Sequence, residues 1–558
     1  MNQRIDLTIT GMTCEHCALT IKHLLEKKPG ILSQDVNYRS GKGTVTFDPN
    51  IITGGEIVQT INQTPHYRVK DVKENNPANS SVARFDLIII GGGSAAFAAA
   101  IRANEIGLTT LMVNAGLPFG GTCVNVGCVP SKTLIREAEA VYHASHANFR
   151  GIRPRGADIN FRQVIRNKKD LVKTLQQKKY MDVVSGFENL KMIEGWASFA
   201  DEKTILVNDK DRPASTVGTF TADRFIIATG ASANVPDIEG LNEVGYLTNT
   251  SLFDLEEQPP SITIMGAGYI GCEIAMAYNR LGTKVRMIEF TDRILRIQTP
   301  DIGEELQKYM RNEGIEILPN FRAVKFEKSV RGTIIHCRCA DGSFTQIVEP
   351  GEIVVATGIK PNTSNLGLKN IGVQLNKKGH IQVNELMETN LKHIYAVGDV
   401  ASTPAYVYTA AYEGKIAVEN AFTGSKNKAD YTSLPWVVFT DPQVSGVGID
   451  EVQASEQNIP FEVSRLELKD IPRAITANDT RGFIKLIRNT ETDRLIGARV
   501  VAPEGGELIH ALSMAVKYGI PVRELAGSFY PYLTLGEGIK LAAIAFGKDV
   551  AKLSCCAS

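Results

Sequence analysis

The first seventy residues alternate between segments typical of strands and segments typical of amphipathic helices. RIDLTIT is typical of a strand, and the helix after it has apolar residues at a helical spacing, at Ala18, Ile21, Leu24 and Leu25. Further strands are expected at 31–38, 43–47 and 67–72, with a second helix at 55–63. The order βαββαβ predicts a ferredoxin-like unit over residues 1–72. The polar stretch KENNPANSS then predicts a flexible linker over 73–83.

Two apolar strands run directly into glycine-rich turns, in FDLIIIGGGSAA and SITIMGAGYIG. This pattern predicts two Rossmann-like dinucleotide-binding folds in one chain. The later segments RFIIATGA, EIVVATGIKPN and HIYAVGDVA indicate that the first fold is completed by chain returning from the second. We therefore expect one dinucleotide-binding domain at 84–255 and 346–425, and another at 256–345.

Residues 426–558 differ in character, because strands VVFTDPQVSGVG, FIKLIRN and LIGARVVA accompany a helix at 506–518. They predict a separate α+β domain. The expected fold class is α/β, with two Rossmann-like domains and this α+β domain preceded by the ferredoxin-like unit.

Composition narrows the class of protein. The 61 basic and 61 acidic residues cancel, which gives no support for nucleic-acid binding. Apolar residues at 43% are typical of globular domains. No apolar run is long enough for a membrane span, and the N-terminus lacks the pattern of a secretory signal. We expect a cytoplasmic enzyme.

Nine cysteines stand in short clusters: Cys14 and Cys17, Cys123 and Cys128, Cys272, Cys337 and Cys339, and Cys555 and Cys556. In a chain without a secretory signal this clustering favours metal or redox chemistry over structural disulfides.

Each glycine turn has three small positions with separate tasks. They allow the tight turn, the approach of backbone N–H groups to a pyrophosphate, and close packing of helix on strand. In the first turn they are Gly91, Gly93 and Ala96, and in the second they are Gly266, Gly268 and Gly271.

The residue that meets the adenine ribose is expected about twenty positions after each turn. The first fold has Asn114 there, an amide in place of the usual acid, and the second has Glu289. Glu289 favours NADH, but its neighbours Arg286 and Arg293 are cations that could bind the 2′-phosphate of NADPH. The alternative is that Glu289 is a solvated surface acid.

GGTCVNVGCVPSK places two cysteines before Pro130 and a helical run from Ser131. We expect both Cys123 and Cys128 at a helix N-terminus, where the dipole and Lys132 favour thiolate.

From Phe85 to its end the chain resembles the pyridine nucleotide-disulfide oxidoreductase family, with lipoamide dehydrogenase and glutathione reductase as relatives. The resemblance covers both glycine turns, the C-x4-C motif, two ATG turns at 228–230 and 356–358, and the GD pair at Gly398 and Asp399.

The resemblance implies that the first fold binds FAD and the second NADPH, with NADH as the alternative that Glu289 favours. Asp399 is then on the ribityl chain of FAD, and Lys132 is near the flavin and paired with Glu273. Cys128 is the charge-transfer thiolate, Cys123 the exchanging thiol, and Tyr269 lies over the flavin. Further nucleotide contacts implied by the family are Gly121, Thr122, Ala228, Gly230, Arg293, Gly358 and Val407.

The C-terminal segment departs from the disulfide-reducing members of the family. They carry a histidine in a segment like HPTLSE, whereas this chain has YLTLGE, with Tyr532 at the histidine position. A departing thiolate needs a proton near neutral pH, which histidine supplies and tyrosine does not. The chain ends in LSCCAS, and the adjacent thiols of Cys555 and Cys556 suit a soft metal ion.

GMTCEHC presents Cys14 and Cys17 on a loop that opens a helix. A zinc site needs two further ligands, and a thioredoxin-like motif needs a different fold. The segment resembles the heavy-metal-associated domain, which binds a soft ion between two thiolates.

Four features together resemble the branch of the family that reduces Hg(II) to Hg(0). They are the heavy-metal-associated domain, the flavin disulfide-reductase core, tyrosine in place of the histidine, and the terminal SCC. This resemblance implies a homodimer with active sites shared between subunits, and Hg(II) or its thiol complexes as substrate. It implies a relay from Cys14 and Cys17 through Cys555 and Cys556 to Cys123 and Cys128, with Tyr269 and Tyr532 lining the inner site. The alternatives are a disulfide reductase with a fused metal domain and a non-enzymatic metal carrier.

Three cysteines have no role in that scheme. Cys272 is expected to be a packing residue. Cys337 and Cys339 alternate along one strand, so they could bind metal, although ordinary strand positions are the favoured interpretation.

Overall fold

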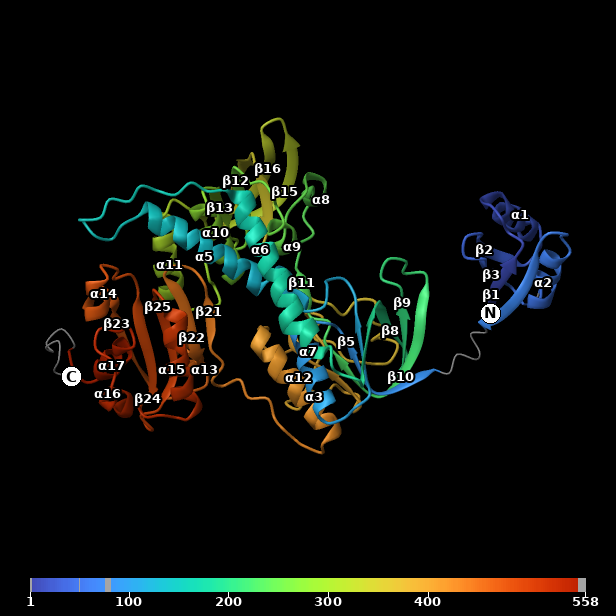
Figure 1. Ribbon diagram of the computed structural model, residues 1–558. Coiled ribbons are helices and arrows are strands. Elements are labelled where there is room, and N and C mark those ends of the chain that lie inside the picture. The colour runs from blue at the N-terminus through green and yellow to red at the C-terminus, as the bar shows by residue number, and fades with distance from the viewer. Residues whose placement is uncertain (1–2, 50, 76–81, 550–558) are drawn as a thin grey trace. The chain divides into compact units, whose positions relative to one another are not determined.

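The structure is a computed structural model that describes residues 3–49, 51–75 and 82–549 (Figure 1). The chain divides into two compact units, the first made by Met1–Arg84 with the short stretch Thr219–Thr221, and the second by the rest of the chain from Phe85 onward. In the described residues, no helix has both the length and the apolar character needed to cross a membrane.

The first unit is a four-stranded antiparallel sheet with two helices. Its elements are β1 (Gln3–Thr10), α1 (Glu15–Glu26), β2 (Ile31–Asn37), β3 (Lys42–Phe47), α2 (Gly54–Asn62) and β4 (Arg68–Asn75). The strand order β2-β3-β1-β4 and the antiparallel pairing confirm the predicted ferredoxin-like unit. Its core is closed by buried apolar residues of both helices and the sheet, among them Leu7, Ile21, Leu25 and Ile57.

The expected linker is too long. β4 continues to Asn75 and pairs with β1, and β5 (Ala83–Ile90) begins at Ala83, so both ends of the segment 73–83 belong to strands. Charged side chains on an edge strand can extend into solvent, so their polarity does not end the ladder. Residues 76–81 of the expected linker lie outside the described part of the chain.

The first Rossmann-like domain is built on a seven-stranded sheet of order β7-β6-β5-β10-β9-β8, with β20 paired to β10. These strands are β6 (Thr110–Asn114), β7 (Leu190–Glu194), β8 (Trp196–Asp201), β9 (Thr204–Asn208), β10 (Thr216–Ile227) and β20 (Ile394–Ala396). Helices α3 (Ser94–Glu105) and α12 (Val407–Phe422) pack on each other, which confirms that later chain completes this domain (Figure 1).

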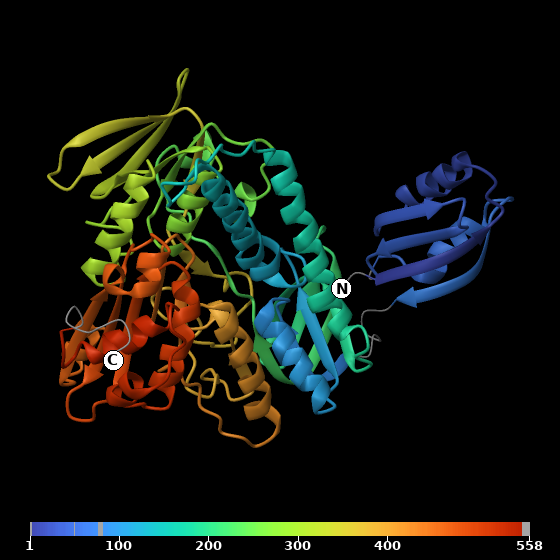
Figure 2. The same ribbon diagram turned by 60° about the vertical axis from the view of Figure 1, so that its left-hand side comes forward.

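The second Rossmann-like domain has a parallel sheet of order β14-β13-β12-β18. Its elements are β12 (Ser261–Met265), α10 (Tyr269–Arg280), β13 (Lys284–Ile288), α11 (Pro300–Asn312), β14 (Glu316–Leu318) and β18 (Glu352–Val355). An antiparallel sheet of β15 (Phe321–Ser329), β16 (Gly332–Cys339) and β17 (Phe344–Glu349) projects from it (Figure 2). The expected boundary after residue 345 is therefore wrong, because it falls inside β17 and β18 still pairs with β12.

The C-terminal domain is a five-stranded antiparallel sheet of order β21-β22-β25-β24-β23, covered by helices, as the predicted α+β domain requires (Figure 2). Its elements are β21 (Trp436–Val438), β22 (Gln443–Gly448), α13 (Glu451–Glu456), β23 (Phe461–Glu467), α14 (Pro472–Thr476), β24 (Phe483–Asn489), β25 (Leu495–Ala502), α15 (Gly505–Lys517), α16 (Val522–Gly527) and α17 (Glu537–Ile544). VVFTDPQVSGVG is not one strand, because residues 439–442 form a connection between β21 and β22. Pro442 in that connection has no N–H to give to a ladder.

The remaining elements connect the domains of the second unit. They are α4 (Gly121–Val126), α5 (Cys128–Ser145), α6 (Phe161–Gln176), a π-helical turn at Gln177–Met181, α7 (Asp182–Val184), β11 (Ala231–Ala233), α8 (Leu241–Val244), α9 (Asn249–Leu252), β19 (Ile359–Pro361) and 3-10 turns at Gly398–Val400 and Leu468–Asp470. Of these, α5 packs against both α6 and α10, which places the start of α5 beside the second Rossmann-like domain.

Candidate active site

The first unit presents two thiols on one loop. Cys14 is the N-cap of α1 and Cys17 lies in its first turn, with the two Sγ atoms 3.6 Å apart. Hydrogen bonds from the Thr13 backbone and hydroxyl, the Cys14 backbone and the Tyr67 hydroxyl lower the pKa of Cys17 to about 6. At neutral pH Cys17 is therefore a thiolate beside an exposed second thiol, a pair suited to a soft metal ion.

The first glycine turn is closed by backbone contacts that leave no space for side chains. Gly91 has φ +132°, and a Cβ there would lie 2.1 Å from the carbonyl oxygen of Ala228 in the first ATG turn. A Cβ at Gly121 would lie 2.6 Å from the Cα of Gly93. Two stretches of bare backbone thus meet at the N-terminus of α3, an arrangement suited to a pyrophosphate.

The other residues expected to hold FAD surround this turn. Asn114 ends β6, and its Nδ2 donates to the carbonyl oxygen of Leu117 at 2.8 Å. Burial raises the pKa of Asp399, which lies in the 3-10 turn after β20. Ala96 is buried in the first turn of α3, Thr122 lies in α4, Gly230 follows β10, and Val407 begins α12. The bare backbone and the buried polar groups fit FAD.

The three glycines of the second turn differ in the space around them. A Cβ at Gly266 would lie 2.6 Å from the carbonyl oxygen of Ala356, and one at Gly271 would lie 2.1 Å from the carbonyl oxygen of Gly266. Gly268 has no heavy atom within 4 Å of its ideal Cβ position. Gly266 and Gly271 are therefore required by the fold, while Gly268 leaves open space where a dinucleotide would approach.

Glu289 is fixed at this turn. Its side chain is only 7% exposed, and Oε2 accepts the N–H of Ala267 at 2.8 Å. The other oxygen, Oε1, accepts from the backbone and the hydroxyl of Thr291, each at 2.8 Å. The alternative of a solvated surface acid is therefore wrong.

The two arginines near Glu289 are each paired with another acid. Arg286 donates from Nε to Glu316 on β14 at 2.7 Å. Arg293 donates from Nη1 to Asp292 at 2.8 Å. Both cations are therefore partly neutralised before any nucleotide binds.

Cys123 and Cys128 occupy two different helices. Cys128 is the first residue of α5, which starts three residues earlier than expected, while Cys123 lies inside α4. A hydrogen bond from Cys123, opposed by burial and helped by Lys132, lowers the pKa of Cys128 to about 7. The same hydrogen bond, burial and the charge of Cys128 raise the pKa of Cys123. The expectation that both thiols are acidified is therefore wrong for Cys123, because the hydrogen bond between the thiols favours only the Cys128 anion.

The expected pairing of Lys132 with Glu273 is confirmed. Lys132 Nζ donates to Glu273 Oε2 at 2.6 Å, and Glu273 is only 7% exposed. The second oxygen of Glu273 accepts the N–H of Phe439 at 2.9 Å. Lys132 Nζ also lies 4.6 Å from the centre of the Phe439 ring. A buried carboxylate thus divides its charge between a cation and a backbone donor.

Tyr269 begins α10, the helix that also carries Glu273. Its ring stacks on Trp436 of β21 with the centroids 5.4 Å apart, and its hydroxyl accepts from Gln298 Nε2 at 2.6 Å. Burial raises the pKa of Tyr269, so it stays a neutral phenol.

The remaining described cysteines fit packing positions. Cys272 is fully buried, its thiol donates to the carbonyl oxygen of Ala267 at 3.5 Å, and burial raises its pKa. Burial raises the pKa of Cys337 to about 11, and Cys339 is partly exposed on the same strand. Among the described residues no group of three or more His, Cys, Asp or Glu is arranged to hold a metal.

Three family descriptions match the chain. "Pyridine nucleotide-disulphide oxidoreductase" matches residues 85–414, its "dimerisation domain" matches 434–543, and "Heavy-metal-associated domain" matches 6–66. Curated relatives match along the whole length. A "Mercuric reductase" of Staphylococcus aureus is 38% identical, with 99% of this chain and 98% of the relative covered. The chain belongs to the mercuric reductase family. A second "Mercuric reductase", of Lysinibacillus sphaericus, is 37% identical over 99% of this chain and 100% of the relative.

A solved structure shares the architecture of this member of the mercuric reductase family. It is the "Cu(II) complex of HOCl-induced flavoprotein disulfide reductase RclA from Escherichia coli", with a TM-score of 0.74 and 26% identity. The likeness covers 84% of this chain and 100% of that one.

Two further expectations concern the C-terminal domain of this mercuric reductase family member. Tyr532 is 52% exposed and lies in the segment before α17, where Leu533 is also exposed. Cys555 and Cys556 lie outside the described residues.

Three contacts at these sites were not predicted from the sequence. They are the hydroxyl of Tyr67 on Cys17, the backbone of Phe439 on Glu273, and the stacking of Trp436 on Tyr269. Each joins residues at least fifty positions apart, and no spacing rule within one helix or strand connects them.

Proposed function

We propose that the chain reduces Hg(II) to Hg(0) with two electrons from reduced nicotinamide. The observation that carries the proposal is the dithiol of Cys123 and Cys128, in which Cys128 is the more acidic thiol and lies near the pair of Lys132 with the buried Glu273. A thiolate with a pKa of about 7 is available at neutral pH as a ligand for a soft cation.

The residues divide the work. Cys128 provides the first thiolate for Hg(II), and Cys123 provides the second as its proton leaves. When bound, FAD would supply two-electron redox chemistry between reduced nicotinamide and the Hg(II) at the dithiol. Hg(II) gains two electrons and becomes uncharged Hg(0), which no longer binds thiolates, so both cysteines are released. Tyr269 and Tyr532 position the ion.

Cargo delivery involves the other cysteine pairs. Hg(II) is captured by Cys14 and Cys17, passes to Cys555 and Cys556, and reaches Cys123 and Cys128 of the neighbouring subunit. The match to a dimerisation domain over residues 434–543 supports a homodimer with shared sites. Thiols stay reduced in the cytoplasm, and reduced nicotinamide is available there, so the proposed location of the protein is the cytoplasm.

The deciding experiment compares electron acceptors. Purified holoenzyme is expected to oxidise reduced nicotinamide with Hg(II) in excess thiol, and to do so at least about a hundredfold faster than with lipoamide or glutathione disulfide. The physical reason is that Tyr532 stands at the family's histidine position, and a tyrosine, unlike a histidine, does not exchange its proton readily near pH 7. Faster turnover with a disulfide would support the disulfide-reductase alternative, and bound flavin without any turnover would support the metal-carrier alternative.

For the reductant we propose NADH in preference to NADPH, although the family resemblance points to NADPH. A 2′-phosphate would bring negative charge to the buried carboxylate of Glu289, and Arg286 and Arg293 are already paired with acids. The wild-type kcat/KM is expected to be about tenfold or more higher for NADH. Glu289→Gln, which keeps the size and removes the charge, is expected to narrow that ratio. A wild-type preference for NADPH would refute the proposal.

The relay predicts a dependence on the form of the cargo. Replacing Cys555 and Cys556 with alanine is expected to slow turnover about tenfold or more with a bulky thiol complex of Hg(II). A small dihalide complex, which can enter the inner site directly, is expected to be affected much less. Steady-state kinetics with both complexes measures the difference, and equal rates for the variant and the wild type with the bulky complex would contradict the relay.

A further inference from the structure

Helix α10 meets the segment 436–441 at four successive points on one face. Tyr269 stacks on Trp436, Glu273 accepts the N–H of Phe439, and both Met276 and Arg280 contact Asp441. The four helix positions are spaced by four, three and four residues, which places them on one side of a helix. The helix that carries the active-site carboxylate is thus attached along its length to one segment of the C-terminal domain.

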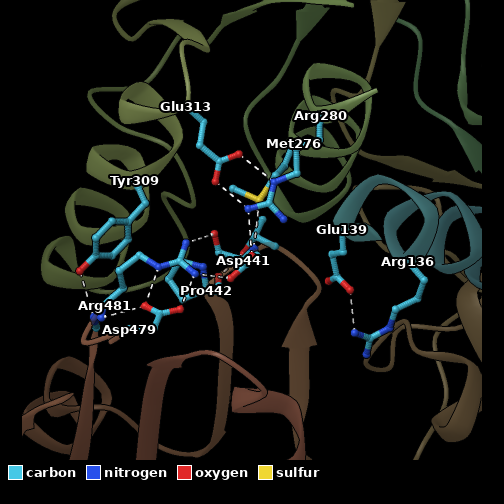
Figure 3. A network of polar contacts seen from close by, with 12 residues as sticks. Arg136, Glu139, Met276, Arg280, Tyr309, Glu313, Asp441, Pro442, Asp479 and Arg481 are labelled. Atoms are coloured by element: carbon cyan, nitrogen blue, oxygen red, sulfur yellow. Dashed lines mark hydrogen bonds and ion pairs between the residues drawn. The ribbon is translucent and has the colours of Figure 1, made fainter. Parts of the chain in front are cut away.

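Asp441 makes the polar contacts that hold this segment (Figure 3). Its N–H donates to Met276 Sδ at 3.0 Å, and its Oδ2 accepts from Arg280 Nη2 at 2.9 Å. Arg481 donates from Nη2 to Asp441 Oδ1 at 2.7 Å and from Nη1 to the Asp441 carbonyl oxygen at 3.1 Å. Backbone and side chain of one residue are therefore both fixed, from two different domains.

The cations around Asp441 are themselves held in place. Arg280 forms a double hydrogen bond with Glu313, at 2.8 and 2.6 Å, and lies 4.0 Å from the ring centre of Tyr142. Arg481 is paired with Asp479 at 2.7 Å. Because these charges are mostly buried, loss of one partner leaves others uncompensated, and the arrangement has little freedom to shift.

We propose that Asp441 is a positioning residue for the Lys132–Glu273 pair, acting through the backbone of Phe439. Asp441 lies two residues after Phe439, so its contacts determine where the N–H of Phe439 points. That N–H occupies one oxygen of Glu273 and leaves the other for Lys132.

The contact matters for Cys128. When the Phe439 N–H is in place, it compensates part of the Glu273 charge, and Lys132 can act on the Cys128 thiolate as well as on Glu273. If the segment shifts, Glu273 loses a donor in a buried site and holds Lys132 more completely. Less positive potential then reaches Cys128. Asp441 thereby contributes to the reactivity of a thiol that it does not touch.

The test is the alkylation rate of Cys128 in the reduced holoenzyme at pH 7, followed by mass spectrometry of the peptide that contains it. Asp441→Asn is expected to slow the reaction by about fivefold, because Glu273 without the Phe439 N–H holds Lys132 more completely and less positive potential reaches Cys128. The proposal rests on this chain's own thiol, so failure of mercury turnover would leave it standing, and failure of this test would leave the proposed function standing.

Glu313→Gln is the matched control, since it removes another carboxylate from the same network without touching the segment 439–441. Both variants are expected to lower the Tm, but only Asp441→Asn is expected to slow alkylation. Equal slowing in both variants, or a lowered Tm with unchanged alkylation in Asp441→Asn, would overturn the proposal. If Asp441→Asn yields no folded holoenzyme, Arg481→Lys replaces it, with a smaller slowing expected and an unchanged rate again overturning the proposal.

Discussion

Replacing Cys128 with serine is expected to reduce mercury-dependent oxidation of reduced nicotinamide by about a thousandfold or more, because thiolate ligation and exchange are then lost. The pKa of Cys128, about 7, makes it the ionised member of the pair, and a serine hydroxyl neither ionises at this pH nor binds a soft cation well. The measurement is the steady-state rate with Hg(II) in excess thiol, together with flavin content from visible absorbance. Flavin content is expected to stay at the wild-type level, because the bare backbone of the first glycine turn is unchanged.

Cys272→Ala is the control for this substitution. Cys272 is fully buried, its thiol bonds only to a backbone carbonyl, and burial raises its pKa, so its removal is expected to cost some stability and little activity. Loss of turnover in Cys272→Ala with Cys128→Ser still active would contradict the assignment of the dithiol.

The second large effect is expected from two alanine substitutions in the second glycine turn. One should weaken binding of the reduced nicotinamide without loss of stability, and the other should lower the stability of the domain. Gly268→Ala is expected to keep the wild-type Tm, because no heavy atom lies within 4 Å of the new Cβ, and to raise KM for the reduced nicotinamide about tenfold or more by filling the approach path. Gly271→Ala is expected to destabilise the domain by about 2–4 kcal/mol, because its Cβ would lie 2.1 Å from the carbonyl oxygen of Gly266.

Thermal unfolding and nicotinamide kinetics on the two variants separate these effects. A Gly268→Ala protein with a wild-type KM would show that the dinucleotide does not approach this part of the turn. A Gly271→Ala protein with an unchanged Tm would show that helix and strand can separate there without cost.

Residue patterns along the chain predicted most of its helices and strands. They did not predict the unequal acidity of Cys123 and Cys128 or the contacts between residues far apart in the sequence. The dipole argument expected both Cys123 and Cys128 to be acidified, yet a hydrogen bond between two thiols stabilises one anion at the expense of the other. The pairing of Lys132 with Glu273 was expected from family resemblance, and nothing in the spacing of the two residues would have suggested it. The donor from Phe439 is a backbone group, which every residue except proline has, so no residue type marks it.

Domain boundaries were the least predictable part of the fold. The boundary at 345 failed because β18 returns to the edge of the second parallel sheet before the chain leaves it, and a short buried strand looks the same whichever sheet it joins. The break between β21 and β22 was hidden because apolar residues lie on both sides of the connection at 439–442. That connection turned out to hold the contacts with α10.

Because Cys17 and Cys123 differ in acidity, binding of a cation at their two sites releases different numbers of protons at neutral pH. Cys17 is already ionised at neutral pH, so capture of a cation by the N-terminal loop releases fewer protons than two protonated thiols would. In the proposed relay, delivery to Cys123 and Cys128 must expel the proton of Cys123, and the raised pKa of Cys123 makes this step more favourable as pH rises. As the pH falls, transfer of the cation to Cys123 and Cys128 should therefore become unfavourable well before binding at the N-terminal loop does.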